Sequence, residues 1–311
     1  MTAYFVAIGI MSLIYALLAL GLNLQFGLTR LVNFGVVAFF AIGAYTSALL
    51  ALAGVPLLIS FACATLLAGL AALPIGLLSM RLREDYLAIV TLGFSETVRI
   101  TIQQEAWLTK GVQGLPGIPK VFASLGASQA DTALFVLLLG ITALVAWGTV
   151  RLTRSPLGRL LRAIGDDEPA LTALGKNPTR FKVQIFMVGA SLAGLAGAFY
   201  AHFITFISPE QFIPLVTFYV WMGLIMGGSG KVAGALGGAV LLMVFLEGSR
   251  FIKDWIPGVS EVQMASVRLA AVGLALILVT IYRPHGLFGG RSNCSDMISP
   301  PRPTACCRWN R

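Results

Sequence analysis

Few residues of this chain have the types and spacing that enzyme chemistry needs. The segment 228–231, which reads Gly-Ser-Gly-Lys, comes nearest, because a phosphate-binding loop of the Walker type ends in Gly and Lys. That pattern also needs a glycine five positions before its last glycine and a serine or threonine after its lysine. Here those positions hold Ile225 and Val232. The sequence therefore predicts that the chain binds no nucleotide itself.

Histidine and cysteine suggest neither a nucleophile nor a metal site. His202 is one of two histidines and ends an apolar segment, where a packing role is expected. Cys63 lies in an apolar run and should behave as a small hydrophobic residue. The remaining cysteines, Cys294, Cys306 and Cys307, lack a fourth ligand at the spacing of a zinc site. We therefore expect no catalytic residue, no metal and no enzyme activity.

The composition is that of a membrane protein. Hydrophobic residues make up 57% of the 311 residues, charged residues only 11%, and the mean hydropathy is +0.86. A soluble domain carries about a quarter charged residues. We expect an all-α polytopic transmembrane helical bundle of about eight to ten helices, some of them broken. The apolar segments fall at 4–22, 35–53, 57–79, 86–103, 132–150, 183–207, 214–229, 232–248 and 264–282.

Basic charge is concentrated in two polar segments. Basic residues outnumber acidic ones by four in 151–182 and by four again in 283–311, which accounts for eight of the nine net charges. Basic residues that flank spans stay in the cytoplasm, so both segments are expected inside and, if every apolar segment crosses, the N-terminus outside. Nucleic-acid binding explains the charge less well, because no aromatic residues suited to base stacking alternate with it.

Polar residues within the apolar segments mark a candidate transport path. Glu96 and Arg99 lie three apart on one helical face and make their segment a poor span, so they either line a path or neutralise each other. Asn23 and Asn33 belong to a stretch of amides and glycines, and 227–231 interrupts the second half similarly. Such backbone at membrane depth must be satisfied by protein or by a water-filled cavity. Paired interruptions are typical of transporters with broken helices.

Two ridges of small residues run along the segment 183–207. They consist of Gly189, Ala193, Gly197 and Ala201 and, beside these, of Ala190, Gly194 and Ala198. Such ridges let a neighbouring backbone approach closely. In one interpretation the ridges pack against other helices of the same bundle. In the other they line a dimer interface or a translocation path. The sequence leaves this choice open.

The polar segment 151–182 has the pattern of a short helix held between caps. Aspartate and asparagine favour helix starts, proline fits the first helical position, and glycine stops a helix. The predicted order is an amphipathic turn over 159–164 ended by Gly165, a cap at Asp166 or Asp167, a helix from Glu168 stopped at Gly175, and a cap at Asn177. The result is a rigid element across the cytoplasmic surface, which can transmit a push.

The same segment resembles a known family. EPALTALG at 168–175 is similar to the EAA loop of ABC-importer permeases. The spacing between its Ala and its Gly is one residue longer than in the usual pattern of other importers. The region 154–212, from RSPLGRLLRAIGDDEPALTALG to ISPEQF, resembles LivM-type permeases of branched-chain amino acid ABC transporters. GLNLQFGLTRLVNFGVVAFFAIGAYTSALL, DYLAIVTLGFSETVR, GLPGIP and YRPHGLFGG resemble the same family, so the resemblance covers about 5–290.

The resemblance implies that 151–182 couples the chain to cytoplasmic ATPase subunits. The residues expected to do so are Arg159, Arg162, Asp166, Asp167, Glu168, Ala170, Leu171 and Gly175. The implied partners are a homologous LivH-type permease, two ABC ATPases that use ATP and Mg, and a periplasmic substrate-binding protein. The implied location is the bacterial inner membrane.

Substrate and class leave alternatives open. Leucine, isoleucine and valine are the leading substrates, while urea, short amides, other amino acids and sugars use permeases of similar pattern. From a different class, an ion-coupled secondary transporter would need no ATPase. The scarcity of carboxylates within the apolar segments argues against a proton relay of that kind.

The last residues, 291–311, fall outside the resemblance. Their mixture of Pro, Ser, Cys and Trp has no apolar periodicity, so we expect a disordered tail after a permease domain at 1–290. Deletion from Arg291 onward should therefore leave assembly and substrate uptake close to those of the intact chain. Loss of the assembled complex on truncation would show instead that the tail binds a partner.

Overall fold

The computed structural model describes residues 2–78, 82, 84–122, 126–253, 261–283 and 286–287. The predicted tail at 291–311 lies outside the described residues. Within them the chain is a bundle of α-helices, and its only strands are two short ones that pair antiparallel, β1 (Leu115–Pro116) and β2 (Phe206–Ile207). The predicted all-α class is confirmed.

The helices follow the apolar segments, with shorter elements between them. The long helices are α1 (Thr2–Thr29), α2 (Val36–Leu52), α3 (Leu57–Leu78), α4 (Glu84–Gln104), α6 (Ala127–Arg154), α9 (Pro178–Ile204), α10 (Pro214–Gly227), α11 (Val232–Lys253) and α12 (Glu261–Tyr282). The short ones are α5 (Ala106–Thr109), α7 (Pro156–Asp166), α8 (Glu168–Ala173), and the 3-10 turns η1 (Gly111–Gln113) and η2 (Pro209–Gln211).

Five helices of the described residues are long and apolar enough to cross a bilayer. They are Tyr4–Thr29, Leu57–Leu78, Gln129–Arg154, Pro178–Ile204 and Pro209–Gly227, and Val36–Leu52 and Val232–Gly248 are shorter apolar helices. The helix α4 is not among them, as its charges led us to expect, although it is one continuous helix of 21 residues.

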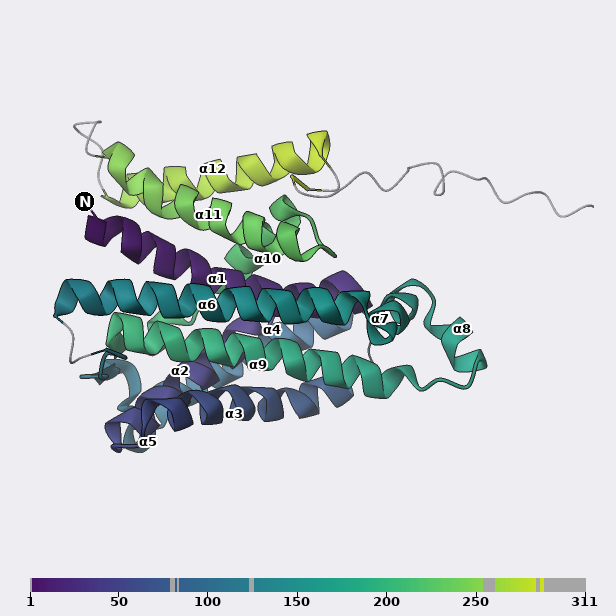
Figure 1. Ribbon diagram of the computed structural model, residues 1–311, viewed down its shortest axis with the longest axis horizontal. Helices are drawn as coiled ribbons and strands as arrows, with labels where there is room; N and C mark the ends of the chain where they lie inside the picture. The colour runs from purple at the N-terminus through teal and green to yellow at the C-terminus, as the bar shows by residue number, and fades with distance from the viewer. Residues whose placement is uncertain are drawn as a thin grey trace, which may run out of the picture.

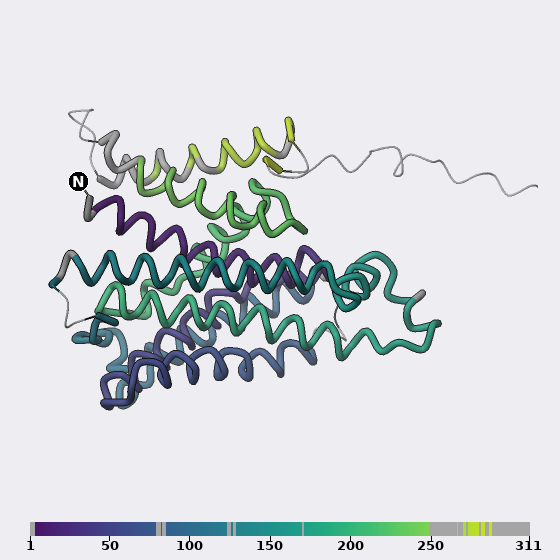
Figure 2. The backbone as a smooth tube through the Cα atoms, viewed as in Figure 1, coloured from purple at the N-terminus to yellow at the C-terminus, as the bar shows by residue number. Residues whose placement is uncertain are grey.

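The two ends of the bundle differ. In Figures 1 and 2, α7 and α8 project from one end, while the chain's N-terminus and α5 lie at the opposite end. If α7 and α8 face the cytoplasm, the N-terminus lies outside, in agreement with the charge distribution. The end with α7 and α8 is called the inner end, and the end with the N-terminus and α5 is called the outer end.

The long helix α9 occupies the centre of the bundle and packs against α1, α2 and α3. Its small residues make this possible. A Cβ built on Gly197 would fall on the carbonyl oxygen of Phe40 in α2, and one on Gly194 would meet Ala68 of α3. A Cβ on Gly189 would lie 2.7 Å from the carbonyl oxygen of Gly21 in α1. Both ridges therefore serve packing within this subunit, which settles the alternative left open by the sequence.

The two polar interruptions predicted from the sequence, the stretch with Asn23 and Asn33 and the segment 227–231, lie against each other in the structure. The helix α1 continues to Thr29, so the first interruption begins at Arg30 and not at Asn23. The side chain of Asn23 accepts a hydrogen bond from the backbone N–H of Gly230 at 2.8 Å, and a Cβ on Gly27 would lie 2.7 Å from the same nitrogen. Because the side chain of Asn23 bonds to Gly230 across the bundle, it does not compete for the backbone of its own helix. This explains why α1 extends beyond the end at residue 22 that the sequence predicted.

Candidate coupling site

The helix α7 is fixed at its start and along one face. The hydroxyl of Ser155 accepts a hydrogen bond from the N–H of Gly158 at 3.2 Å, and Pro156 occupies the first turn. Leu161 and Ile164 are buried, and α7 packs against α1. An amphipathic helix capped in this way is held by its apolar face.

Gly165 does not end the amphipathic helix, contrary to the sequence prediction. The helix continues to Asp166, and Asp167 is its C-terminal flanking residue. A Cβ on Gly165 would lie 2.9 Å from the carbonyl oxygen of Leu28. Gly165 thus permits close approach to the end of α1, and packing carries the helix past it. Asp166 faces Arg30 across a 3.4 Å ion pair in which both side chains are exposed, so this pair contributes little.

The predicted docking helix exists as α8, which ends as the sequence predicted. The N–H of Lys176 donates to the carbonyl of Leu171 at 3.2 Å, and that of Gly175 donates to Thr172 at 3.0 Å. With φ of +73° at Gly175, these bonds form the glycine-terminated helix end known as a Schellman motif. Leu171 is buried, whereas Leu174 is 76% exposed. The tip of α8 therefore presents an apolar side chain outward.

An ion pair attaches α8 to α9. The carboxylate of Glu168 lies 2.5 Å from the Nζ atom of Lys182, whose side chain is only 13% exposed. Asn177 caps α9 by accepting a hydrogen bond from the N–H of Thr179 at 3.1 Å, as predicted. The ion pair therefore connects α8 directly to α9, and the cap fixes the start of α9.

The structure brings only some of the predicted coupling residues together. Glu168, Leu171 and Gly175 build α8 and its end, and Ala170 lies in α8. Arg162 donates to the carbonyl of Thr153 at 3.2 Å, so it ties α7 back to α6. Arg159 is exposed on α7. Lys182 was missed as a site residue, although a lysine fourteen positions after Glu168, at the start of a span, could have suggested the pair.

Asn23 and Asn33, predicted as path residues, are both buried and engaged within the protein. The amide of Asn33 donates to the side chain of Gln25 at 2.9 Å and accepts from the N–H of Gly35 at 2.7 Å. Gln25 in turn donates to the carbonyl of Phe186 in α9 at 2.9 Å. The backbone carbonyl of Asn33 accepts from the indole of Trp221 at 2.9 Å. This network satisfies the broken backbone between α1 and α2 with protein groups.

Replacing Asn33 with alanine should destabilise the protein. Gly35 and Gln25 would each lose a buried partner, and a buried polar group left unpaired costs about 1–3 kcal/mol. We expect a lower midpoint of thermal unfolding in detergent, with transport by the remaining folded protein little changed. A matched control is Gln129→Ala, which removes an exposed amide side chain at the outer end of α6. Equal thermal stability of Asn33→Ala and the wild type would contradict this structural role.

Glu96 and Arg99 do meet, on α4. The Nε atom of Arg99 lies 3.1 and 3.0 Å from the two carboxylate oxygens of Glu96, and its Nη2 atom also contacts that carboxylate. Their side chains are 38% and 22% exposed. The pair is therefore reachable from outside this subunit.

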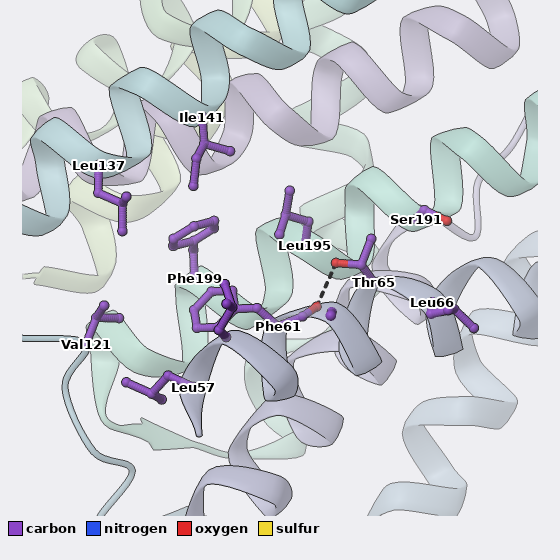
Figure 3. Close-up of a pocket in the computed structure, with 12 residues that line it drawn as sticks. Leu57, Phe61, Thr65, Leu66, Val121, Leu137, Ile141, Ser191, Leu195 and Phe199 are labelled. Atoms are coloured by element: carbon purple, nitrogen blue, oxygen red, sulfur yellow. Dashed lines mark hydrogen bonds between the residues drawn. The ribbon is translucent and has the colours of Figure 1, made fainter. Parts of the chain in front are cut away.

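An apolar cavity of about 820 Å³ lies between α3, α6 and α9 (Figure 3). Leu57, Phe61, Leu137, Leu195 and Phe199 are among its lining residues, and none of the lining residues is charged. The hydroxyl of Thr65 donates to the carbonyl of Phe61 at 2.8 Å, so it is already satisfied. This cavity offers nothing to the charged ends of an amino acid.

Comparison with known proteins decides the family. The family described as "Branched-chain amino acid transport system / permease component" matches residues 4–281. The chain belongs to this family. It is 34% identical to the high-affinity branched-chain amino acid transport system permease protein LivM of Escherichia coli strain K12, over 91% of this chain and 69% of that protein. The predicted family and the permease role are therefore confirmed.

Other members of the family are more distant. The chain is 24% identical to the probable branched-chain amino acid transport permease protein LivM of Methanocaldococcus jannaschii, over 93% of each. It is 25% identical to the permease protein LivH of Salmonella typhimurium, over 88% of this chain and 91% of that protein. No solved structure matches the chain.

Proposed function

We propose that this chain is the membrane-spanning permease subunit of an ATP-driven importer in the bacterial inner membrane. Its substrates are the branched-chain amino acids leucine, isoleucine and valine, which a periplasmic binding protein delivers at the outer end. The relatives in this family carry names that refer to this transport. The chain binds no cofactor, and ATP hydrolysis takes place on two partner ATPases at the inner end.

The element that supports ATP coupling is α8. It projects from the inner end of the bundle, carries the exposed Leu174, and is attached to α9 through Glu168 and Lys182. Because α9 packs against α1, α2 and α3, a push on α8 reaches the centre of the bundle. The partner permease, of LivH type, completes the translocation path, and the two bundles alternate access to it as the ATPases close and open.

Co-purification and reconstitution test this proposal. We expect the tagged chain to co-purify with a second permease and with ATPase subunits. Liposomes that contain this complex should take up leucine only with loaded binding protein outside and ATP inside. Uptake by the chain alone, driven by an ion gradient without ATP, would establish the secondary-transporter alternative. Uptake of urea or a sugar in place of leucine would keep the importer and change its substrate.

A further inference from the structure

The helix α4 has a face that the residues described in the structure leave uncovered. One side of α4 is buried, with Leu87, Thr91 and Ser95 turned toward α2 and α10. The opposite side is exposed and carries Ile89, Gly93, Thr97, Ile100 and Thr101. The ion pair of Glu96 and Arg99 lies at the edge of this exposed side.

The pair lies well within the length of the helix. Glu96 comes twelve residues after the start of α4 and eight before its end, which corresponds to about 18 Å and about 12 Å along the helix axis. Between these ends α4 packs against α2 and α10. Glu96 and Arg99 therefore lie away from both ends of α4, and we infer that they are at membrane depth.

Lipid is a poor neighbour for this face. A charged side chain at the centre of a bilayer costs about 2.5–3.5 kcal/mol or more, so such residues face a partner or water. The exposed face of α6, which is a candidate span, carries Val136, Leu139 and Leu144, and its apolar character is what a face toward lipid requires. The exposed face of α4 differs by its two charges and two threonines, and α4 is not apolar enough to be a candidate span.

We propose that Glu96 and Arg99 bind the two charged ends of the amino acid as it crosses the membrane. This inference rests on the proposed function, because it assigns the substrate site of that same importer. The guanidinium of Arg99 takes the α-carboxylate, and the carboxylate of Glu96 takes the α-ammonium group. Arginine suits this task because its planar fork matches a carboxylate.

The ion pair also explains how the site remains stable when it is empty. Without substrate the two side chains satisfy each other through the bonds of Arg99 to both oxygens of Glu96. When a zwitterion enters, each partner exchanges one opposite charge for another, so no charge is left uncompensated at membrane depth. Glu210 of η2, which interacts electrostatically with Arg99 and packs near the end of α4, adds negative charge toward the outer end.

Aromatic residues adjoin the same helix one to two turns earlier. The hydroxyl of Thr91 accepts a hydrogen bond from the N–H of Phe34 at 3.0 Å, and the ring of Phe34 lies 5.4 Å from that of Phe218, which is exposed. Thr91 precedes Glu96 by five residues, or about 7.5 Å along the axis. These rings pack on the buried side of α4, whereas Ile89 and Ile100 are exposed on the same side as the ion pair and are the residues that an aliphatic side chain would contact there.

Transport assays on the reconstituted complex test the role of the charges. We expect Glu96→Gln and Arg99→Gln to lower leucine uptake about tenfold to a hundredfold, the loss expected when one charged hydrogen bond to the substrate disappears. Assembly with the partner subunits should be unchanged. The matched control is Lys120→Gln, which breaks the ion pair of Lys120 and Asp131, 3.0 Å apart, at the outer end of α6. Its uptake should equal that of the wild type.

The exchanged pair Glu96→Arg with Arg99→Glu separates recognition from simple neutralisation. If the residues only cancel each other's charge, the exchanged pair restores uptake, and the proposal is overturned. If they bind the substrate, the exchanged pair assembles like the wild type but does not restore uptake, because the ammonium and carboxylate partners are now in the wrong places. Single variants with wild-type uptake would also overturn it.

Cysteine labelling tests the path without relying on transport. In a chain whose four native cysteines are replaced by serine, Thr97→Cys should react with a water-soluble, membrane-impermeant thiol reagent in the assembled complex. The control Leu144→Cys, on a face that is 68% exposed at that residue but turned to lipid, should not react. If neither cysteine reacts with the reagent in the complex, the exposed face of α4 lies against lipid or the partner, and the proposal is wrong.

The two proposals fail in different ways. If wild-type uptake needs no ATP or binding protein, the proposed function is wrong, whatever the variants do. If wild-type uptake needs both, but the Glu96 and Arg99 variants transport leucine normally, only the substrate site is wrong.

Discussion

Replacing Gly197 with leucine is expected to abolish the folded yield of this permease. A Cβ at this position would fall on the carbonyl oxygen of Phe40 and lie 2.8 Å from the backbone nitrogen of Ala44. Neither backbone atom can rotate away, so α9 and α2 would have to separate. Overpacking in a core commonly costs about 1–3 kcal/mol, and a leucine between two backbones exceeds that range. The measurement is the amount of monodisperse protein recovered after extraction in mild detergent.

A glycine on an uncovered face supplies the control. Gly140 of α6 has no atom within 4 Å of its built Cβ, so Gly140→Leu should leave the folded yield near the wild-type value. Gly194→Leu should resemble Gly197→Leu, because Ala64 and Ala68 of α3 occupy the space beside it. A Gly197→Leu protein with normal yield and thermal stability would mean that α9 does not pack against α2 as described.

Replacing Gly175 with proline is expected to uncouple transport from ATP hydrolysis while the subunit still inserts and assembles. Proline fixes φ near −65°, whereas Gly175 has φ of +73°, and proline also lacks the N–H that donates to Thr172. The end of α8 would unwind and Leu174 would lose its fixed position. We expect leucine uptake in vesicles to fall at least about tenfold, together with the stimulation of ATPase activity by loaded binding protein.

Two further variants sharpen this test. Gly54→Pro introduces the same backbone conflict at the outer end of the bundle, because Gly54 has φ of +84° and its N–H donates to the carbonyl of Ala51. This variant should leave the coupling of transport to ATP hydrolysis intact. Glu168→Lys should also uncouple transport from ATP hydrolysis, because it places a second positive charge next to that of Lys182. Adding Lys182→Glu should restore part of the coupling. Normal uptake and normal ATPase stimulation in Gly175→Pro would remove α8 from the mechanism.

The sequence by itself determined the class of the fold, the order of its elements, the end of α8 at Gly175 and the cap of α9 at Asn177. These features depend on local physical chemistry. Long apolar runs can only be satisfied as helices in a bilayer, and a cap such as Asn177 acts within a few residues of the bond it makes. The stop at Gly175 is local for the same reason. The family resemblance depended on local motifs too, such as EPALTALG at 168–175.

Only the tertiary structure decided what the polar and small residues contact. Asn33 bonds to Gln25 and Trp221, which is 188 positions away, and Gly197 meets Phe40 of a helix far earlier in the chain. Gly165 has the local pattern of a helix stop, yet packing against Leu28 continues its helix. Glu96 and Arg99 were paired by spacing, but their uncovered face became visible only when α2 and α10 were in place. Contacts between residues distant in sequence depend on how the whole bundle closes, and local periodicity carries no information about that closure.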